Sequence, residues 1–164
     1  PRRSPGFCPS VKVTTVWVGK GRVKWADAGS IEYTRRLPRH LNYTEIQVKP
    51  IPFKGNEAQV RSAEAEKILE QIKQGDRLVT LDERGADLTS HAFAELIDSA
   101  AQLGTRRLVF AIGGPYGHGE SVRQQSWKTI RLSHMVLNHS MARMLLSEQL
   151  YRASTILWGG QYHH

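Results

Sequence analysis

The sequence predicts an α/β fold, in which a mostly parallel sheet carries helices on both faces. Strand-like and helix-like stretches alternate from Val11 onwards, a spacing typical of βαβ units. The run at 107–112 (RLVFAI) is apolar throughout, as strands covered on both faces are. The 164 residues suit one domain, which we place at 11–164 after a leader over residues 1–10.

The first half of the chain predicts two strands and two helices. A β-branched run at 11–18 indicates a strand, and residues 26–37 indicate a helix that ends before a proline. Residues 43–48 alternate as a second strand does. Asn56 is a good N-cap for the next helix, and Gly75 is its expected terminator.

The second half continues the alternation. Residues 77–81 predict a short strand, followed by a turn at 82–85. Thr89 is expected to cap an amphipathic helix that ends before Gly104, and the buried strand at 107–112 follows. A last helix is expected at 139–152, where apolar residues lie nearly all round, which indicates burial.

The formal charge of +8 lies entirely in the first third of the chain. Residues 1–56 contain eleven lysines and arginines against three acids, whereas the other 108 residues contain twelve of each sign. Such a basic region attracts polyanions, chiefly RNA or DNA, although a solvated basic surface without a partner is the alternative. No apolar run approaches the roughly 20 residues needed to span a bilayer, and the single cysteine excludes an internal disulfide.

The leader PRRSPGFCPS is rich in arginine and serine, and no acid occurs before Asp27. This composition resembles the remnant of an organelle transit peptide, so we expect a chloroplast or mitochondrial protein. A disordered leader on a cytoplasmic protein, or an arbitrary boundary of the expressed chain, stays open as an alternative.

Four glycines occur within residues 113–119, directly after the buried strand at 107–112. Ligands of α/β sheets bind at the carboxyl ends of strands, and glycine lets a backbone approach a ligand closely. The loop matches neither the Walker pattern nor G-x-G-x-x-G. It therefore indicates a ligand site, with a tight turn as the alternative.

The last helix carries three charges in an apolar setting. Glu148 and Arg152 are four residues apart and can pair. Arg143 has no acid at such a spacing, so its partner must lie in another element, another subunit or a ligand phosphate, unless backbone carbonyls anchor it. The histidines form no zinc pattern and there is no GxSxG motif, so a metal enzyme or a hydrolase has little support.

Several runs occur together in one order. They are VGKG (18–21), EYTRRL (32–37), VTLDERG (79–85), IGGPYG (112–117), LSHMVLNH (132–139), the set Arg143, Glu148, Gln149, Tyr151, Arg152 and Ala153, and the final Tyr162-His163. Together they resemble the bacterial family of 23S rRNA pseudouridine-N3 methyltransferases, small enzymes of the SPOUT superfamily. The resemblance covers nearly everything after Val11.

The resemblance implies a parallel sheet whose C-terminal segment forms a trefoil knot, a rare exception to unknotted chains. It implies S-adenosylmethionine as cofactor, no metal, ribosomal RNA of the large subunit as partner, and a homodimer with each site at the subunit interface. The cofactor would be held by three loops, which map to Leu81, Gly113, Gly114, Leu132, Ser133, His134, Met135, Val136 and Leu137.

Four residues are candidates for positioning the uracil ring and its backbone: His139, Arg143, Tyr162 and His163. No obvious base for the N3 proton is present. The basic first third would hold the RNA, and its candidate residues are Arg22, Lys24, Arg35, Arg36 and Arg39. A non-catalytic RNA-binding or ribosome-assembly factor on the same fold is the alternative function, and another nucleotide-binding α/β enzyme is a third.

The chain departs from the family at three places. Asn138 stands where the family usually has proline, and Tyr116 stands where its glycine loop often has glutamate. The tail ends in His163-His164 instead of a histidine followed by a basic residue, and these two histidines could also derive from an affinity tag. The cofactor loops keep the family's pattern, whereas the tail lacks the final basic residue that would contact a phosphate.

Overall fold

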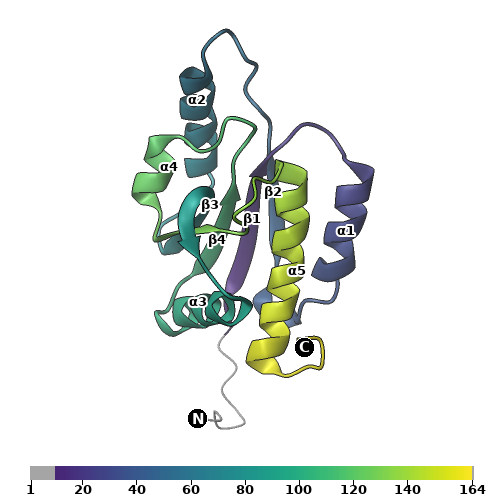
Figure 1. Cartoon of the computed structure of the whole chain (residues 1–164). Helices are drawn as coiled ribbons and strands as arrows, with labels where there is room; N and C mark the ends of the chain where they lie inside the picture. Colours follow the sequence, from purple (N-terminus) through teal and green to yellow (C-terminus); the bar gives the residue numbers. More distant parts are fainter. Residues whose placement is uncertain (1–9, 164) are drawn as a thin grey trace.

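A computed structural model describes residues 10–163 (Figure 1), so nearly all of the leader predicted at 1–10, and His164, lie outside the described residues. Five parallel strands form one sheet in the order β2-β1-β4-β3-β5, which confirms the parallel α/β prediction. The strands are β1 (Lys12–Val18), β2 (Thr44–Val48), β3 (Asp76–Asp87), β4 (Arg107–Ile112) and β5 (Lys128–Arg131). The single domain at 11–164 and the trefoil knot stay predictions.

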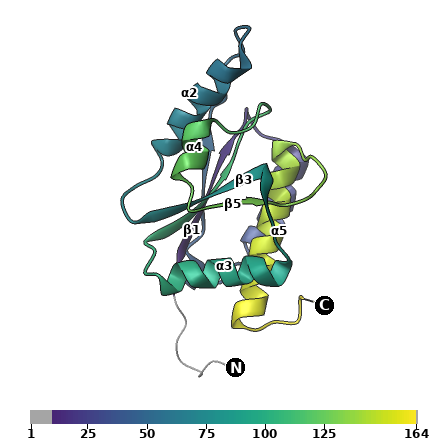
Figure 2. The same ribbon diagram turned by 60° about the vertical axis from the view of Figure 1, so that its left-hand side comes forward.

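Helices cover both faces of the sheet (Figures 1 and 2). Helices α2 and α4 pack together on one face, and α5 packs between α1 and α3 on the other. The helices are α1 (Lys24–Thr34), α2 (Glu57–Leu69), α3 (Ser90–Gln102), α4 (Glu120–Gln125) and α5 (His139–Trp158), with a short 3₁₀ helix η1 (Arg39–Leu41). None of these described helices is long and apolar enough to cross a membrane.

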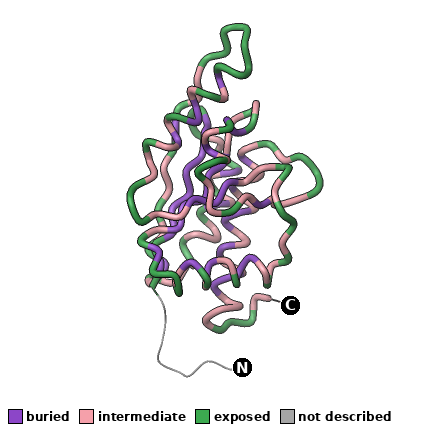
Figure 3. Tube along the Cα trace, turned by 90° about the vertical axis from the view of Figure 1, so that its left-hand side faces the viewer, coloured by how far each residue is buried: buried purple, intermediate pink, exposed green. Residues whose placement is uncertain are grey.

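The core has two layers, one on each face of the sheet. The buried residues gather in the interior of the molecule (Figure 3). Strand β4 is the central strand of the sheet and is buried from Leu108 to Ile112, as its unbroken apolar run predicts. Phe110 packs under α3 and α5, while Val109 packs under α2 and α4. Burial on both faces makes the sheet a rigid frame for the loops at its edges.

The side-chain caps agree with the sequence. The Asn56 side chain accepts hydrogen bonds from the first turn of α2, and Thr89 does the same for α3. Asn138, which replaces the family's proline, caps α5 by accepting from Met141 N at 2.9 Å. This departure therefore leaves the start of α5 hydrogen-bonded.

Helix α5 continues past the expected end at 152 to Trp158. Two further boundaries differ from the prediction for local reasons. Helix α1 ends at Thr34, because the next backbone bonds, such as Leu37 N to Thr34 O, are of the tighter i to i+3 kind. Helix α2 ends at Leu69, six residues before the expected Gly75. Gly75 has φ +87° and instead serves the turn into β3, where its carbonyl accepts from Arg106 N.

The turn predicted at 82–85 is wrong, because β3 continues through it to Asp87. The register against β5 shifts between Leu81 and Ala86, as at a β-bulge. A Cβ on Gly85 would meet the backbone of Ile130 at 2.4 Å, so glycine here permits a close approach of two strands. Helix α4 and strand β5, which the sequence did not indicate, complete this side of the sheet.

Candidate functional site

Two of the three predicted cofactor loops begin beside β3, at the carboxyl ends of β4 and β5, whereas Leu81, expected in the third loop, lies within β3. In the strand register, Leu81 lies opposite Ile112 on one side and Ile130 on the other. The glycine loop starts directly after Ile112, and residues 132–137 follow β5. The structure therefore places Leu81 next to the starts of these two loops, at the edge where parallel α/β sheets bind ligands, and their role in binding a cofactor stays a prediction.

The glycines of this loop are required by the loop's own packing. A Cβ on Gly113 would meet the Gly117 carbonyl carbon at 3.1 Å, and one on Gly114 would meet Glu64 Oε2 at 2.7 Å. Gly117 N donates to Gly114 O at 3.0 Å and has φ +78°. The tight turn, left open as the alternative to a ligand site, is thus present, and it shapes the edge beside Leu81.

The loop at 132–137 presents apolar side chains outwards. Met135 and Val136 are 78% and 80% exposed, and Ser133 Oγ accepts from Met135 N at 2.9 Å. His134 Nε2 lies 2.7 Å from Asp87 Oδ2, and Arg131 binds the same carboxylate. The hydrogen bonds from Arg131 lower the pKa of Asp87, so its carboxylate stays charged beside the loop.

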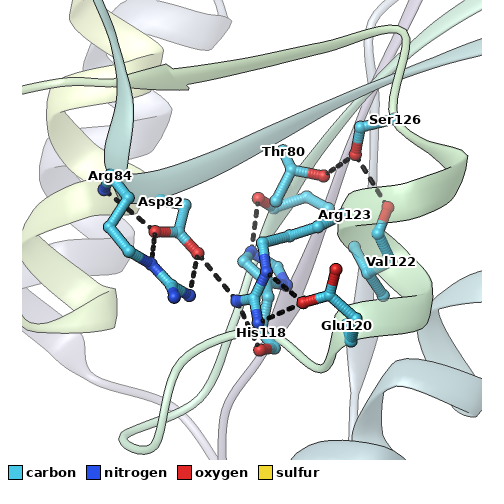
Figure 4. A network of polar contacts seen from close by, with 9 residues as sticks. Thr80, Asp82, Arg84, His118, Glu120, Val122, Arg123 and Ser126 are labelled. Carbon is cyan, nitrogen blue, oxygen red and sulfur yellow. Dashed lines mark hydrogen bonds and ion pairs between the residues drawn. The ribbon is translucent and has the colours of Figure 1, made fainter.

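A polar network lies beneath the glycine loop (Figure 4). The Asp82 carboxylate binds Arg84 and Arg123, both at 3.2 Å, and Arg123 also donates to His118 O at 2.8 Å. Burial raises the pKa of Asp82, but the hydrogen bonds from Arg84 and Arg123 outweigh it and leave the pKa below its usual value. The network ties the bulged part of β3, and the start of α4, to the loop.

Little in the sequence indicates this network. The one sequence feature that includes part of it is the run VTLDERG of the family resemblance, which contains Asp82 and Arg84. His118 is only 3% exposed, and its Nε2–H donates to Ala111 O at 3.2 Å. Its Nδ1 is buried without a hydrogen-bond partner, and burial lowers its pKa. The ring is therefore neutral and packs under Gly113.

Arg143 finds its partners in other elements of the same chain. Its guanidinium binds Asp27 of α1 at 2.5 Å and Glu45 of β2 at 2.7 Å, and it stacks over the Trp17 ring. Arg143 is 8% exposed, so the pairing compensates a buried charge. Carboxylates, and not the backbone carbonyls considered as an alternative, therefore anchor Arg143. The guanidinium faces the protein interior. Its role toward RNA stays a prediction.

The C-terminal tail folds back on α5. Tyr162 OH donates to Glu148 Oε1 at 3.1 Å, and Glu148 also forms the predicted pair with Arg152, at 2.6 Å. Arg152 stacks on the Tyr162 ring, and His163 Nε2 lies 2.9 Å from His91 Nε2 of α3. The tail thus packs against one long helix and its neighbours.

The four predicted catalytic residues do not meet in one chain. His139 opens α5 beside the cofactor loops, and Arg143 lies one turn further along. The tail contacts α5 at Glu148 and beyond, about 14 Å along the axis from His139 at a rise of about 1.5 Å per residue. Figure 1 shows the tail at the end of α5 far from the loops.

The predicted RNA-binding residues also form two groups. Arg22 and Lys24 lie at the start of α1, on the carboxyl edge of the sheet. Arg35, Arg36 and Arg39 lie beyond the other end of α1, where the first two pair with Glu32 and Arg36 stacks over Tyr151. Thus one basic group lies near the loops and the other near the tail. Among the described residues, no cluster of three or more potential ligands for a metal occurs.

The sequence matches known proteins over almost its whole length. A family model described as "Predicted SPOUT methyltransferase" matches residues 11–163. A "Ribosomal RNA large subunit methyltransferase H" of Trichlorobacter lovleyi is 42% identical over 154 residues, covering 94% of this chain and 100% of the relative. The protein of the same name from Geobacter sp. (strain M21) is 40% identical over 155 residues, covering 94% and 99%.

A "Putative RNA methyltransferase" of Arabidopsis thaliana is 40% identical over 157 residues, covering 94% of this chain and 81% of the relative. Among solved structures, a ribosomal RNA small subunit methyltransferase E from Neisseria gonorrhoeae, bound to S-adenosyl methionine, aligns with a TM-score of 0.46 at 12% identity, covering 90% of this chain and 67% of that one. The names of the relatives do not favour the non-catalytic alternative. The chain belongs to the SPOUT methyltransferase family.

Proposed function

We propose that this protein transfers a methyl group from S-adenosylmethionine to ribosomal RNA of the large subunit. The observation that carries the proposal is the register of Leu81 against Ile112 and Ile130, because the glycine loop starts directly after Ile112 and the loop at 132–137 starts two residues after Ile130. The relatives that match over the whole chain are named for large-subunit rRNA methylation. The finer target, N3 of a pseudouridine, rests on the resemblance of the motifs alone.

The loops suit an adenosyl cofactor better than a polyphosphate. They combine exposed apolar side chains at Met135 and Val136 with a glycine turn, and lack a lysine positioned for phosphates. When bound, S-adenosylmethionine supplies a methyl group already activated by its sulfonium charge. The residues that would hold the cofactor are Leu81, Gly113, Gly114 and 132–137. Their task is to fix the orientation of its methyl group for attack by the RNA base.

The protein's own part in the reaction is orientation. His139 lies at the first turn of α5, next to the loop at 132–137, where it can contact the bound nucleotide. His118 and Asp82 are engaged beneath the loop, so neither is placed to take the N3 proton. Arg143 holds α5 against α1 and β2, and in this way sets the position of His139.

A homodimer would unite the separated groups. Within one chain the cofactor loops and Arg22 lie at one end of α5, while the tail and Arg39 lie at the other. A two-fold axis across α5 would set the tail of one copy beside the loops of its partner. The exposed Trp25 and Ile31 of α1 offer apolar surface for such a contact.

Mixed dimers test this arrangement. A Gly113→Val chain lacks a working loop, and a chain carrying Tyr162→Ala and His163→Ala lacks a working tail. Each is expected to be inactive alone, and their co-expression to restore methyl transfer. Activity that does not return on mixing, although the two chains co-purify, would refute a site built from two chains.

We also propose that the protein acts in a chloroplast or mitochondrion. The acid-free leader supports this, and it lies outside the described residues. A fluorescent fusion of the natural full-length protein is expected to reach one of these organelles. Diffuse cytoplasmic fluorescence would contradict the proposal.

Calorimetric titration with S-adenosylmethionine tests the proposed function at its first step. Binding that saturates in the micromolar range, and is more than about tenfold weaker in the Gly113→Val variant, is the expected result. A lack of binding at millimolar cofactor would overturn the assignment. Binding of RNA with steep salt dependence, but without cofactor binding, would point instead to the non-catalytic factor.

A further inference from the structure

Two aromatic side chains form an exposed pair at the carboxyl edge of the sheet. Phe53, in the segment between β2 and α2, lies against Tyr116 of the glycine loop, with ring centroids 5.7 Å apart and an interplanar angle of 33°. Phe53 is 54% exposed, and Tyr116 is half-buried. The pair therefore leaves aromatic surface open to solvent beside the glycine loop.

A buried carboxylate supports both halves of the pair from below. Glu64 of α2 is 2% exposed, and its Oε1 accepts from Ile51 N at 3.1 Å, two residues before Phe53. Its Oε2 has no hydrogen-bond partner and lies against Gly114, two residues before Tyr116. Because one rigid side chain contacts both segments, the two rings are held in place before any partner binds.

The surroundings of the pair are basic. The segments that end β1 and β2 at this edge carry exposed cations, and Gln47 Nε2 binds Gly19 O at 2.9 Å and so joins the two segments. Four of these cations form no ion pair within residues 10–163, unlike Arg35 and Arg36 at the far end of α1. They are Lys20, Arg22, Lys49 and Lys54.

We propose that Phe53 and Tyr116 form a stacking platform for an unpaired nucleotide of the RNA substrate, next to the cofactor loops. Aromatic faces with flanking cations are how proteins bind single-stranded nucleic acid, since bases stack and phosphates pair. Tyr116 follows Gly113 by only three residues, so a base on the platform would lie beside the methyl-transfer site. The inference rests on the proposed function, because it gives the platform a substrate.

Ring removal tests the platform. The probe is a short unstructured RNA that carries 2-aminopurine, a fluorescent adenine analogue whose emission falls on stacking, together with a duplex of equal length. Phe53→Leu and Tyr116→Leu are each expected to weaken binding of the single strand by about 5- to 150-fold. Binding of the duplex and of S-adenosylmethionine is expected to stay unchanged. Two variants serve as controls. Tyr116→Phe keeps the ring, and Leu103→Ala removes an exposed apolar side chain at the C-terminal end of α3.

Two results would overturn the platform. One is that both leucine variants bind the single strand with the parent's affinity and quench 2-aminopurine as the parent does. The other is a loss of cofactor affinity without a loss of RNA affinity, which would make the rings mere supports of the loop.

Methyl transfer by the parent protein to large ribosomal subunits is measured in parallel. If the parent transfers no methyl group while the leucine variants still lose RNA affinity, the proposed function fails and the platform stands. If transfer occurs and RNA affinity is unchanged, the platform fails and the function stands.

Discussion

The guanidinium of Arg143 binds the carboxylate of Glu45 at 2.7 Å, although 98 positions separate the two residues in the sequence. Asp27 completes the pairing from α1. Two of the three acids in the basic first third are therefore used to neutralise one buried arginine. This contact fixes α5 on the sheet, and with it the loop that precedes α5.

Arg143→Ala is expected to destabilise the fold. Its loss leaves two carboxylates without their shared partner, and truncating one member of a hydrogen-bonded buried charge pair costs about 2–5 kcal/mol. Asp27 and Glu45 are about a quarter exposed, so we expect about 2–3 kcal/mol in urea unfolding.

Arg35→Ala is the matched control, because Arg35 pairs with Glu32 at the surface and should cost less than about 1 kcal/mol. An equal, small loss in both variants would contradict a structural role for Arg143. Turnover of Arg143→Ala is expected to fall more than its cofactor affinity, since the arginine positions α5 and does not line the loops.

His118 makes stability depend on pH. Burial lowers its pKa in the fold below the ordinary value of 6.5, whereas the unfolded chain titrates at that value. As the pH falls through 6.5, His118 takes up a proton in the unfolded chain but stays neutral in the folded one. The free energy of unfolding therefore decreases towards pH 5, and the contribution of His118 is fully present above pH 7.

His118→Leu is expected to flatten this slope in urea unfolding measured between pH 5 and pH 7. His40, whose pKa burial also lowers, is present in both proteins and leaves a smaller common slope. Identical slopes in parent and variant would show that His118 titrates equally in both states.

Gly113→Val is expected to weaken S-adenosylmethionine binding by more than about tenfold. The Cβ alone would lie 3.1 Å from Gly117 and 3.3 Å from the His118 ring, so the added methyl groups must push the loop out of place. Gly55→Ala is the control for backbone strain alone, because Gly55 has φ +85° and nothing lies within 4 Å of a Cβ there. Calorimetry that finds parental affinity in Gly113→Val would refute the site.

Replacement of Arg35, Arg36 and Arg39 by alanine is expected to weaken RNA binding and leave cofactor binding unchanged. If each contacts one phosphate, the slope of log affinity against log salt falls by about 2–3. Arg22→Ala with Lys24→Ala, at the other end of α1, should lower it by about 1–2. An unchanged slope in both variants would show that the charge of the first third does not hold RNA.

Much of the fold was predictable because its signals are local. Asn56 and Thr89 cap helices through bonds within three residues, and the apolar run at 107–112 needs no partner to be recognised. Helix α4 and strand β5 have six and four residues, too few for a hydrophobic period to emerge. Strand β5 forms by pairing with β3, a long-range contact that no local pattern in the sequence indicates.

The site divides in the same way. Its loops could be proposed from motifs, because the run at 112–117 and the run at 132–139 are each unbroken stretches of sequence. The partners of Arg143 and the support of Phe53 by Glu64 depend on tertiary packing, so no local pattern indicates them. Strand β3 extends past the predicted turn because Gly85 lies against β5.

The most direct test of the account is methyl transfer to isolated large ribosomal subunits that carry the unmethylated pseudouridine, with labelled S-adenosylmethionine. We predict that the parent protein adds one methyl group per subunit, that mass spectrometry places it on N3 of a pseudouridine, and that Gly113→Val adds none. Absence of label with the parent protein, or equal label with the Gly113→Val variant, would contradict the account.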